Sequence, residues 1–412
     1  MTKEKSTVPR LRFPGFTDAW KQRKLGEVLK ERNESRSPSA DVPLVSFTVE
    51  NGVTPKTERY NREFLVRDEN KKYKFTQLDD IVYNPANLKF GAIARNKYGA
   101  AVFSPIYVTY GVLSEAHPLF VELIVTSTNF IQRALRYQEG TVYERMAVKS
   151  FDLLRSEIPL PTLPEQEAIG SFFSGLDQLI TLHQRKLDDV KELKKALLQK
   201  MFPKGNGNDF PELRFPEFTD AWKQRKLGEV ATFAKGNGYS KKDLVIEGSP
   251  IILYGRLYTK YETVISEVDT FVSVEDNKKS VVYSEGGEVL VPASGESSLD
   301  IARASVVAKK GIILGGDINI IRLHSEIFPV FLALTISNGK QQKGLSKRAQ
   351  GKSVVHLHNS DLKKVDLDFP TLPEQEVIGN FFSDLDQLIT LHQRQLDHLK
   401  LLKKALLQQM FI

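Results

Sequence analysis

No cysteine occurs among the 412 residues of this chain. This absence excludes disulfide bonds, thiolate-bound metals and a cysteine nucleophile. The sequence also lacks any run of about 18 apolar residues, so it predicts no membrane-spanning helix. The opening residues, MTKEKSTVPR, carry charges but no apolar stretch of the kind found in secretory signals. We therefore expect a cytoplasmic protein without membrane contacts.

Motifs of catalysis are equally scarce, and each partial match fails at a defining position. Asn84-Pro85-Ala86-Asn87 resembles the start of the Asn-Pro-Pro-aromatic motif of amino-methyltransferases, but its third and fourth positions differ, which favours a simple turn. Gly351-Lys352-Ser353 resembles the end of a phosphate-binding loop, but Ser346 stands where that loop requires glycine. His356 and His358 have no obvious carboxylate companion in the sequence. The sequence therefore predicts neither a catalytic centre nor a metal site.

What the sequence does contain is two pairs of repeated segments. Residues 11–28 and 213–230 both read LRFPxFTDAWKQRKLGEV and differ at a single position. Residues 161–202 and 370–411 form the second pair and are identical at 34 of 42 positions. The stretches between the repeats show no such likeness. A repeated architecture that carries two dissimilar blocks is typical of a recognition protein with two binding surfaces rather than of an enzyme.

Charge gives a weaker indication. The formal net charge of +7 is compatible with a nucleic-acid partner. However, the two dissimilar blocks, residues 29–160 and 231–369, each hold 18 Lys and Arg against 16 Asp and Glu. The first 28 residues hold 7 against 3 and supply much of the excess. Overall basicity therefore does not by itself predict DNA binding.

The closing repeats predict two long amphipathic helices. In the first, Thr162 is the expected N-cap and Glu165 the third helical residue of a capping box, and Thr371 and Glu374 repeat this pattern. Capping and the helix dipole would then account for the paired carboxylates of both PEQE sequences. The apolar residues that recur at heptad spacing are Phe173, Leu176, Ile180, Leu187, Val190, Leu197 and Met201 in the first helix, and Phe382, Leu385, Ile389, Leu396, Leu399, Leu406 and Met410 in the second. The polar His183, Lys194, His392 and Lys403 fall in the same register.

Two nearly identical amphipathic helices in one chain predict a coiled coil. About 40 residues at 1.5 Å per residue give a rod of about 60 Å. Like copies related by a two-fold axis make self-complementary contacts, which favours antiparallel pairing. Since each helix follows its own dissimilar block, antiparallel pairing would hold the two blocks at opposite ends of a spacer. The alternative is that each helix packs only on its own domain.

The predicted fold class is α+β, with two mixed α/β domains and two long helices paired as an antiparallel coiled coil in a pseudo-two-fold internal repeat. Candidate strands are residues 80–84, 107–110, 288–292 and 311–314, and candidate helices are residues 118–135 and 328–337. The expected domains are 1–160, a helix over 161–202, a Gly/Asn-rich linker over 203–212, a second domain over 213–369 and a helix over 370–412.

The repeated segments carry a resemblance to a known family. Trp20 to Val28 and Trp222 to Val230, both WKQRKLGEV, together with the helices that begin LPEQE, resemble the specificity subunit of type I restriction-modification systems. Ser104-Pro105-Ile106-Tyr107 and residues 286–290 (GGEVL) also resemble pieces of that family's recognition domains. The resemblance covers nearly the whole chain.

The resemblance implies a non-catalytic subunit. Each dissimilar block would be a target recognition domain that reads a few base pairs of double-stranded DNA. The repeated segments would dock two methyltransferase subunits, which carry S-adenosylmethionine and methylate adenine N6. Two separate restriction subunits, using ATP and Mg²⁺, would cleave unmethylated DNA. Because the two domains differ, the site would be asymmetric and bipartite, with half-sites about 34 Å apart on one face of the DNA.

Residues that contact DNA are expected to be basic, amide or hydroxyl side chains in turns. In the first block these are Lys71, Lys72, Tyr73 and Lys74 towards phosphates and Asn87, Lys89 and Arg95 nearer the bases. In the second block they are Asn237, Tyr239, Arg256, Tyr258, Ser294, Ser297, Lys347, Arg348 and Gln350.

Two other functions stay open on the sequence alone. A two-headed coiled-coil scaffold or adhesion protein that binds no DNA would share the repeats, and a neighbouring methyltransferase gene would discriminate against it. A self-sufficient methyltransferase or nuclease would need the cofactor or metal motifs that the sequence lacks, and activity of the isolated chain would test it.

Overall fold

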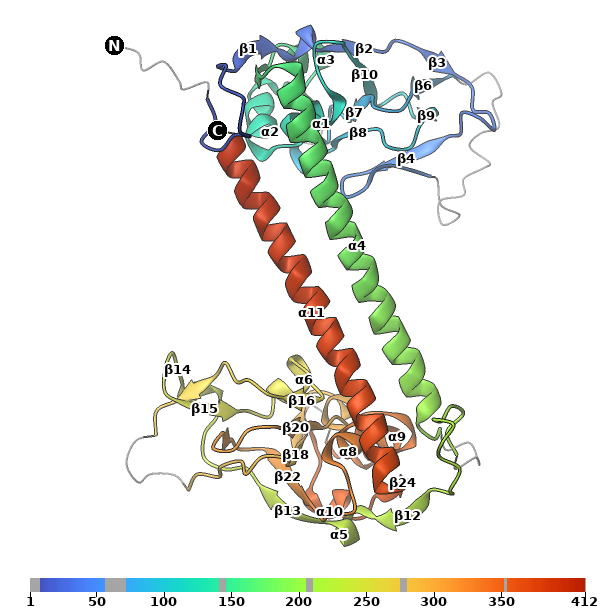
Figure 1. Ribbon diagram of the computed structural model, residues 1–412, viewed down its shortest axis with the longest axis vertical. Helices are drawn as coiled ribbons and strands as arrows, with labels where there is room; N and C mark the ends of the chain where they lie inside the picture. Colours follow the sequence, from blue (N-terminus) through green and yellow to red (C-terminus); the bar gives the residue numbers. More distant parts are fainter. Residues whose placement is uncertain are drawn as a thin grey trace. The chain divides into compact units, whose positions relative to one another are not determined.

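The computed structural model describes residues 8–55, 72–140, 146–204, 210–274, 280–351 and 354–411 (Figure 1). The chain divides into two compact units. Unit 1 comprises Met1–Leu182 with Leu396–Ile412, and unit 2 comprises His183–Gln395. Each unit therefore contains part of both long helices. Among the described residues, no helix is both long and apolar enough to cross a membrane.

Unit 1 is built on a four-stranded antiparallel sheet in the order β2-β10-β7-β8. A three-stranded sheet in the order β3-β6-β9 and the hairpin β4-β5 extend it, and β1 pairs with β11. The strands are β1 (Lys21–Lys24), β2 (Leu29–Glu31), β3 (Ser35–Arg36), β4 (Val45–Thr48), β5 (Gly52–Pro55), β6 (Tyr73–Thr76), β7 (Ile81–Tyr83), β8 (Ile93–Arg95), β9 (Ala101–Phe103), β10 (Val108–Val112) and β11 (Glu157–Leu160). The helices are η1 (Leu25–Glu27), η4 (Leu88–Phe90), α1 (Pro118–Val125), α2 (Thr128–Ala134), η5 (Leu135–Tyr137), α3 (Ser150–Leu154) and α4 (Leu163–Met201), the η elements being 3-10 helices.

The core of unit 1 lies between the four-stranded sheet and α1. Tyr83 and Tyr110 stack with ring centroids 5.7 Å apart, and both are fully buried. Each phenol finds a partner, since Tyr83 donates to the Val148 carbonyl at 3.1 Å and Tyr110 to Ser150 Oγ at 2.9 Å. Burial raises the pKa of Tyr110 to about 12, so its hydroxyl stays protonated as a donor.

Unit 2 uses the same plan. Its main sheet has the order β13-β22-β18-β20-β16, with β16 parallel to β20, and a second sheet has the order β14-β17-β15-β21. The strands are β12 (Lys223–Lys226), β13 (Ala231–Lys235), β14 (Leu244–Val245), β15 (Ser249–Ile252), β16 (Val264–Ile265), β17 (Phe271–Val272), β18 (Val289–Pro292), β19 (Ser294–Gly295), β20 (Ser305–Val307), β21 (Ile313–Leu314), β22 (Ile318–Leu323), β23 (Val355–His356) and β24 (Asp366–Phe369). The helices are α5 (Leu227–Val230), η7 (Lys241–Asp243), α6 (Arg256–Thr259), α7 (Ser298–Ile301), α8 (Pro329–Ile336), α9 (Gly339–Arg348), α10 (Asn359–Leu362) and α11 (Leu372–Met410).

The central elements of the two units correspond, although the two blocks between the repeats are dissimilar in sequence. Strand order β2-β10-β7-β8 matches β13-β22-β18-β20, and the helix pair α1 and α2 matches α8 and α9. The predicted mixed α/β fold is confirmed, as are strands at β7, β10, β18 and β21 and the helix at α8. The single helix predicted over residues 118–135 is wrong. The chain breaks at Thr126 and Ser127, where the Ser127 hydroxyl accepts a hydrogen bond from the Phe130 N–H and caps α2.

Helices α4 and α11 each contain 39 residues and run antiparallel within each unit. In unit 2, residues further along α4 contact residues earlier along α11, as expected for antiparallel helices. These contacts are His183 with His392, Lys194 with Asp386, and Phe202, just after α4, with Phe382. In unit 1, Lys403 Nζ lies 2.6 Å from Asp177 Oδ1. In the repeats, Asp177 corresponds to Asp386 and Lys194 corresponds to Lys403. The two ion pairs therefore join equivalent residues of the two helices.

The predicted seam is buried or half-buried at every position. The fully or nearly fully buried members are Phe173, Leu176, Leu187, Met201, Phe382, Leu396 and Met410, and the half-buried members are Ile180, Val190, Leu197, Leu385, Ile389, Leu399 and Leu406. The seam histidines meet each other, with their Nδ1 atoms 3.4 Å apart. A polar pair inside an apolar seam helps to fix register at some expense of stability.

Replacing both seam histidines with leucine (H183L/H392L) should therefore stabilise the protein. We expect the free energy of unfolding to rise by about 1 kcal/mol, because two half-buried imidazoles give way to apolar side chains. Urea denaturation of the full chain measures the change, with the exposed His398→Leu as control. A fall in stability would show that the histidine contact is a net contributor.

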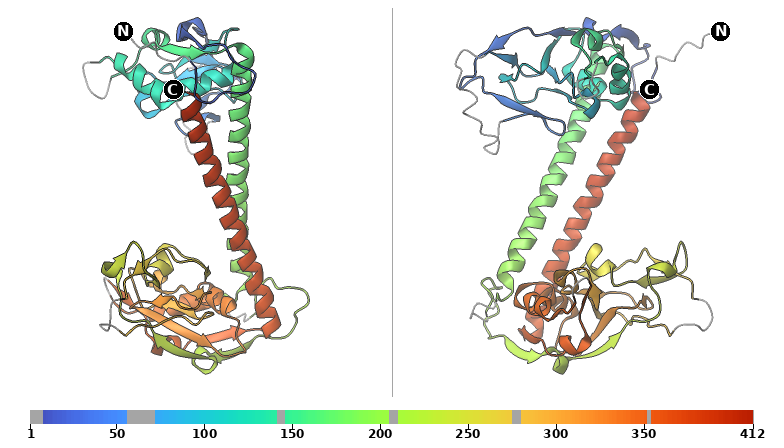
Figure 2. Two further views of the ribbon diagram at one scale, coloured as in Figure 1. Left: turned by 60° about the vertical axis from the view of Figure 1, so that its left-hand side comes forward. Right: turned by 180° about the vertical axis from the view of Figure 1, so that it is seen from behind.

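Close packing at the start of each long helix explains a repeated glycine. A Cβ atom at Gly170 would lie 2.6 Å from Leu119 Cβ, and one at Gly379 would lie 2.6 Å from a ring carbon of Phe328. Within unit 1, α1 lies beside the first turns of α4 (Figure 2). Neither crossing has room for a side chain, so both repeats retain glycine.

The opening and closing repeats lock together through a buried ion pair. In unit 1, Arg12 Nε and Nη2 donate to the two Glu165 carboxylate oxygens at 2.6 and 2.7 Å. This hydrogen bonding raises the pKa of Arg12. In unit 2, Arg214 binds Glu374 in the same bidentate way, at 2.6 Å for both contacts. The two glutamates stand at the third position of α4 and α11, as the capping-box pattern predicts, but their carboxylates bind arginines of the opening repeats.

The glutamine that follows each of these glutamates has a second structural role. Gln166 is fully buried, accepts from the His117 N–H at 2.9 Å and donates to the Pro161 and Glu115 carbonyls. The corresponding contacts of Gln375 are with Phe328, Pro370 and Glu326. The PEQE sequence therefore joins the long helix to the chain that enters α1 or α8.

Removing one partner of the ion pair should destabilise unit 2 strongly. In R214M the Glu374 carboxylate, 1% exposed, is left without its cation. We expect a loss of about 3 kcal/mol in the free energy of unfolding. Thermal unfolding of R214M, E374Q and the double variant measures this loss. The double variant should lose less stability than the two single variants lose in sum. An R214M protein as stable as the parent would contradict this account.

Candidate nucleic-acid interface

The candidate interface lies at the same topological position in both units, where the chain leaves a central strand. In unit 1, β7 runs into the turn at Asn84–Asn87 and the short helix η4. In unit 2, β18 runs through β19 into the short helix α7. The second helix of each pair packs against it, α2 on η4 and α9 on α7. Each unit thus presents one turn and one helix end beside each other.

The unit 1 turn is a hydrogen-bonded turn, as the sequence favours. Asn84 is buried, its Oδ1 accepts from the Ala86 N–H at 3.1 Å, and its own N–H donates to the Ala92 carbonyl at 2.9 Å. Asn87 and Lys89 beyond it are exposed. Lys89 Nζ lies 4.9 Å from the ring centroid of Phe90, which is 63% exposed. This turn offers an amide, a cation and an aromatic ring to solvent.

The unit 2 turn uses its hydroxyls mainly for itself. Ser297 caps α7 by accepting from the Asp300 N–H at 3.2 Å and donating to Asp300 Oδ2 at 2.6 Å. Ser294 is buried, and its Oγ lies 3.0 Å from Nδ1 of His356 across the β19-β23 pair. Both predicted serines therefore shape the turn, and Ser297 also stays exposed at its tip.

The last turn of α9 carries the cations of this surface. Lys347 and Arg348 are exposed, and neither forms an ion pair within the described part of the chain. Gln350 is exposed beside them, and its backbone pairs with that of His356. The dipole of a helix favours cations near its C-terminal end by about 0.3–1 kcal/mol. Because no carboxylate of the described residues pairs with them, both charges are available to an anion. The structure thus brings together Lys347, Arg348, Gln350 and the turn of Ser297.

Unit 1 has equivalents that sequence analysis missed. Arg133 on α2 and Arg136 on η5 are exposed at the end of the helix that corresponds to α9, and Tyr137 beside them is 45% exposed. Neither arginine forms an ion pair among the residues that the structure describes. The two blocks share no sequence here, so only the fold relates these arginines to Lys347 and Arg348.

Two arginines predicted to contact DNA are instead held by carboxylates. Arg95 lies 2.5 Å from Asp79 Oδ1 and 2.8 Å from Glu122 Oε2. Arg256 pairs with Glu262 at 2.7 Å and also with Asp269. Both side chains are nearly buried, so these arginines are structural in this conformation. A hydrogen bond from Lys260, with the nearby Arg256 charge, lowers the pKa of Asp269 to about 2, which keeps that network ionised.

The remaining predicted residues divide by exposure. Tyr73 and Tyr239 are buried in apolar clusters and are not presented to a ligand, which corrects their prediction as contact residues. Lys74 lies 3.3 Å from Asn33 Oδ1 and 3.6 Å from Glu31. Tyr258 is half-buried beside Glu296 and Asp300, and burial raises its pKa.

Lys72 and Asn237 are exposed, with Asn237 donating to Ser280 Oγ at 3.2 Å. Lys71 lies outside the described residues.

The histidine pair of this region is not part of a metal cluster. The rings of His356 and His358 lie parallel with centroids 6.5 Å apart. Across the described ranges, no group of three or more His, Asp or Glu side chains could hold a metal ion. Lys352 and Ser353 of the partial phosphate-loop motif lie outside these ranges. What the interface offers is therefore positive charge, amides and exposed rings, which suit DNA backbone and base edges.

Comparison with known proteins identifies relatives of both halves. A family model described as type I restriction modification DNA specificity domain matches residues 17–192 and 219–401. The MjaVIII type I restriction enzyme specificity subunit of Methanocaldococcus jannaschii is 22% identical over 280 residues, 65% of this chain and 64% of that protein. The MjaIX specificity subunit of the same organism is 21% identical over 284 residues, 64% of this chain and 61% of that protein. Both matches span less than two thirds of the relative's own length.

A solved structure shows the same fold. The S subunit of a type I restriction-modification system from M. genitalium matches with a TM-score of 0.62 and 15% sequence identity. The match covers 98% of this chain and 99% of that one. The duplicated plan of sheet, helix pair and long helix therefore occurs in another protein along nearly its whole length.

Proposed function

Because this chain belongs to the family of type I restriction-modification DNA specificity proteins, we propose that it reads an asymmetric, bipartite DNA site and directs partner methyltransferases to it. One unit would read each half-site. One observation carries DNA reading. At the same place in both units, a turn lies beside a helix end whose exposed cations form no ion pair with other described residues. Because Lys347 and Arg348 differ from Arg133 and Arg136 in their surroundings, the two half-sites would differ in sequence.

An exposed apolar stripe on each long helix supports the partner proposal. On α4, Leu179 and Leu182 of unit 1 are 47% and 45% exposed. The same repeat positions on α11 are Leu388 and Leu391 of unit 2, which are 38% and 50% exposed. These leucines lie off the buried seam and expose apolar surface on one side of each helix, which supports a docking surface there. Two equivalent stripes would dock two copies of one methyltransferase subunit.

The chemistry would belong to the partners. The methyltransferase subunits would bind S-adenosylmethionine and transfer its methyl group to adenine N6. Restriction subunits, where the complex includes them, would use ATP and Mg²⁺. In this proposal the paired helices set the unread gap between half-sites, so that helix length is part of the recognised sequence pattern.

Reconstituted methylation tests the proposal. Plasmid DNA is incubated with labelled S-adenosylmethionine, the neighbouring methyltransferase and this chain. We expect methyl incorporation only when both proteins are present, because neither alone combines recognition with chemistry. Incorporation by the methyltransferase alone at the same sites would contradict the proposal, as would activity of this chain alone.

A further inference from the structure

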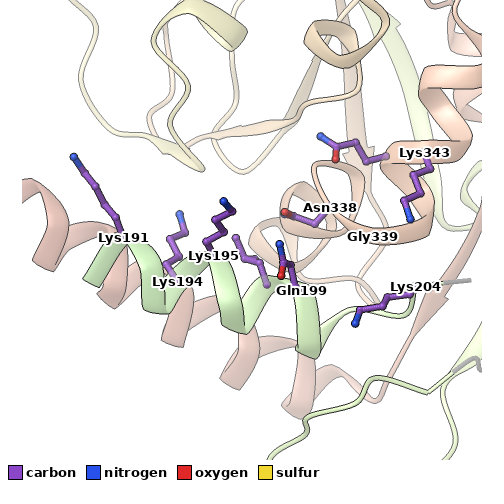
Figure 3. A pocket seen from close by; sticks show the side chains of 10 residues that line it. Lys191, Lys194, Lys195, Gln199, Lys204, Asn338, Gly339 and Lys343 are labelled. Atoms are coloured by element: carbon purple, nitrogen blue, oxygen red, sulfur yellow. The ribbon is translucent and has the colours of Figure 1, made fainter. Parts of the chain in front are cut away.

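A cationic pocket in unit 2 lies outside the candidate interface. It has a volume of about 580 Å³ and lies between the last turns of α4 and the start of α9 (Figure 3). Five lysines line it, namely Lys191, Lys194, Lys195, Lys204 and Lys343. None of its lining residues is acidic. A pocket of this composition attracts an anion.

Three of the five lysines are available for such an anion. Lys194 is held by Asp386, and Lys204 Nζ lies 2.7 Å from Glu212 Oε1. Lys191, Lys195 and Lys343 are exposed and form no ion pair within the described part of the chain. Figure 3 shows Lys195 extending from α4 on the side of α9, and Lys343 pointing from α9 towards α4. The pocket therefore receives positive charge from both helices.

The backbone adds to this field. Helix α9 has 10 residues and begins at the pocket with Gly339, so its N-terminal partial positive charge faces the same space. Gly339 has a φ of +62°, and a Cβ there would lie 2.8 Å from the Pro203 carbonyl oxygen. The close contact with Pro203 brings the end of α4 against the start of α9 and requires glycine at this turn.

The direction of α9 indicates which polyanion fits. Lys343 and Lys347 are four residues apart on one face of the helix, about 6 Å along its axis. Arg348 follows Lys347 at the candidate interface. A line of unpaired cations thus connects the pocket to the surface proposed to read DNA. A nucleic-acid strand is an extended polyanion, so it can bind along a continuous line of cations that runs from the pocket to the DNA-reading turn. An acidic protein surface could bind the pocket alone, and it would not explain why the cations continue to that turn.

We propose that this pocket is a sequence-independent phosphate site for the DNA backbone, in which Lys191, Lys195 and Lys343 neutralise phosphates beyond the base pairs that unit 2 reads. This inference rests on the proposed function. It adds that the repeated helix α4 contributes to DNA affinity directly as well as pairing with α11. Such contacts position DNA without selecting its sequence.

The test compares K191A/K195A/K343A with the control K242A/K309A/K310A, which removes three exposed positive charges elsewhere in unit 2. The full chain, assembled with its methyltransferase, is titrated with a duplex carrying the recognised site and with a random duplex between about 50 and 200 mM salt. We expect the pocket variant to bind both duplexes about tenfold more weakly. Its slope of log affinity against log salt should fall by about 2 to 3, at about 0.9 for each phosphate that the variant no longer neutralises. The ratio of the two affinities should not change.

Three results would overturn the proposal. Unchanged affinity and slope in the pocket variant would show that no phosphate binds there. Loss of assembly with the methyltransferase at unchanged DNA affinity would assign the pocket to an acidic surface of that partner. A parent complex that binds neither duplex would refute the proposed function itself, which separates that failure from a failure of the pocket alone.

Discussion

Reversing the charges at the end of α9 (K347E/R348E) will weaken binding to the recognised duplex by about 100-fold, or about 2.7 kcal/mol. These two exposed cations, which form no ion pair with the residues that the structure describes, become two anions facing phosphates, so attraction is replaced by repulsion. Both positions are exposed on the last turn of a helix, and the fold does not depend on them. Fluorescence anisotropy of the assembled complex on a labelled duplex measures the effect.

A matched variant controls for net charge. K309E/K310E makes the same change at two exposed lysines in the turn before β21, where no DNA contact is proposed. We expect it to lower affinity only several-fold, through the general field of the protein. Equal losses in the two variants would mean that the end of α9 has no special part in recognition.

Introducing charge into the apolar stripes will disassemble the methyltransferase complex. Leu182 and Leu391 occupy the same repeat position, are 45% and 50% exposed, and lie off the buried seam. A glutamate at the centre of an apolar contact costs at least about 2 kcal/mol, which is about 30-fold in affinity. L182E and L391E should each bind one methyltransferase subunit, and L182E/L391E should bind none. Analytical ultracentrifugation of the mixtures measures the stoichiometry.

The control for this experiment is T181E/T390E. These threonines are exposed on the same helices, one residue away but on a different side. Two bound subunits are expected. If L182E/L391E also retained two subunits, the stripes would not be the docking surfaces.

Repetition makes the long helices predictable from the sequence alone. Because the same heptad pattern occurs twice, it indicates the two helices, their seam and their antiparallel direction. The ion pair between Arg12 and Glu165 has no such signal. The two residues lie 153 positions apart, and Glu165 also satisfies a local capping pattern that offers a sufficient explanation of its presence.

The recognition surfaces are harder to predict for a related reason. Residue type and a place near a turn favour Arg95 and Arg256, but whether an arginine meets DNA depends on which carboxylates the fold brings to it. Glu122, on α1, neutralises Arg95 from 27 positions away. Conversely, Arg133 and Arg136 become candidates only through the strand order, which shows that α2 corresponds to α9. The predicted residues that lie exposed at the shared surface are Asn87, Lys89, Ser297, Lys347, Arg348 and Gln350.

Single-molecule mapping of N6-methyladenine shows whether this chain directs methylation to a particular DNA sequence. The host expresses this chain with its neighbouring methyltransferase, and a control lacks this chain. We expect one asymmetric motif of two half-sites separated by an unread gap, and we expect no such motif in the control. A methylated motif that persists without this chain, or the absence of any motif although both proteins are folded and associated, would contradict the proposed function.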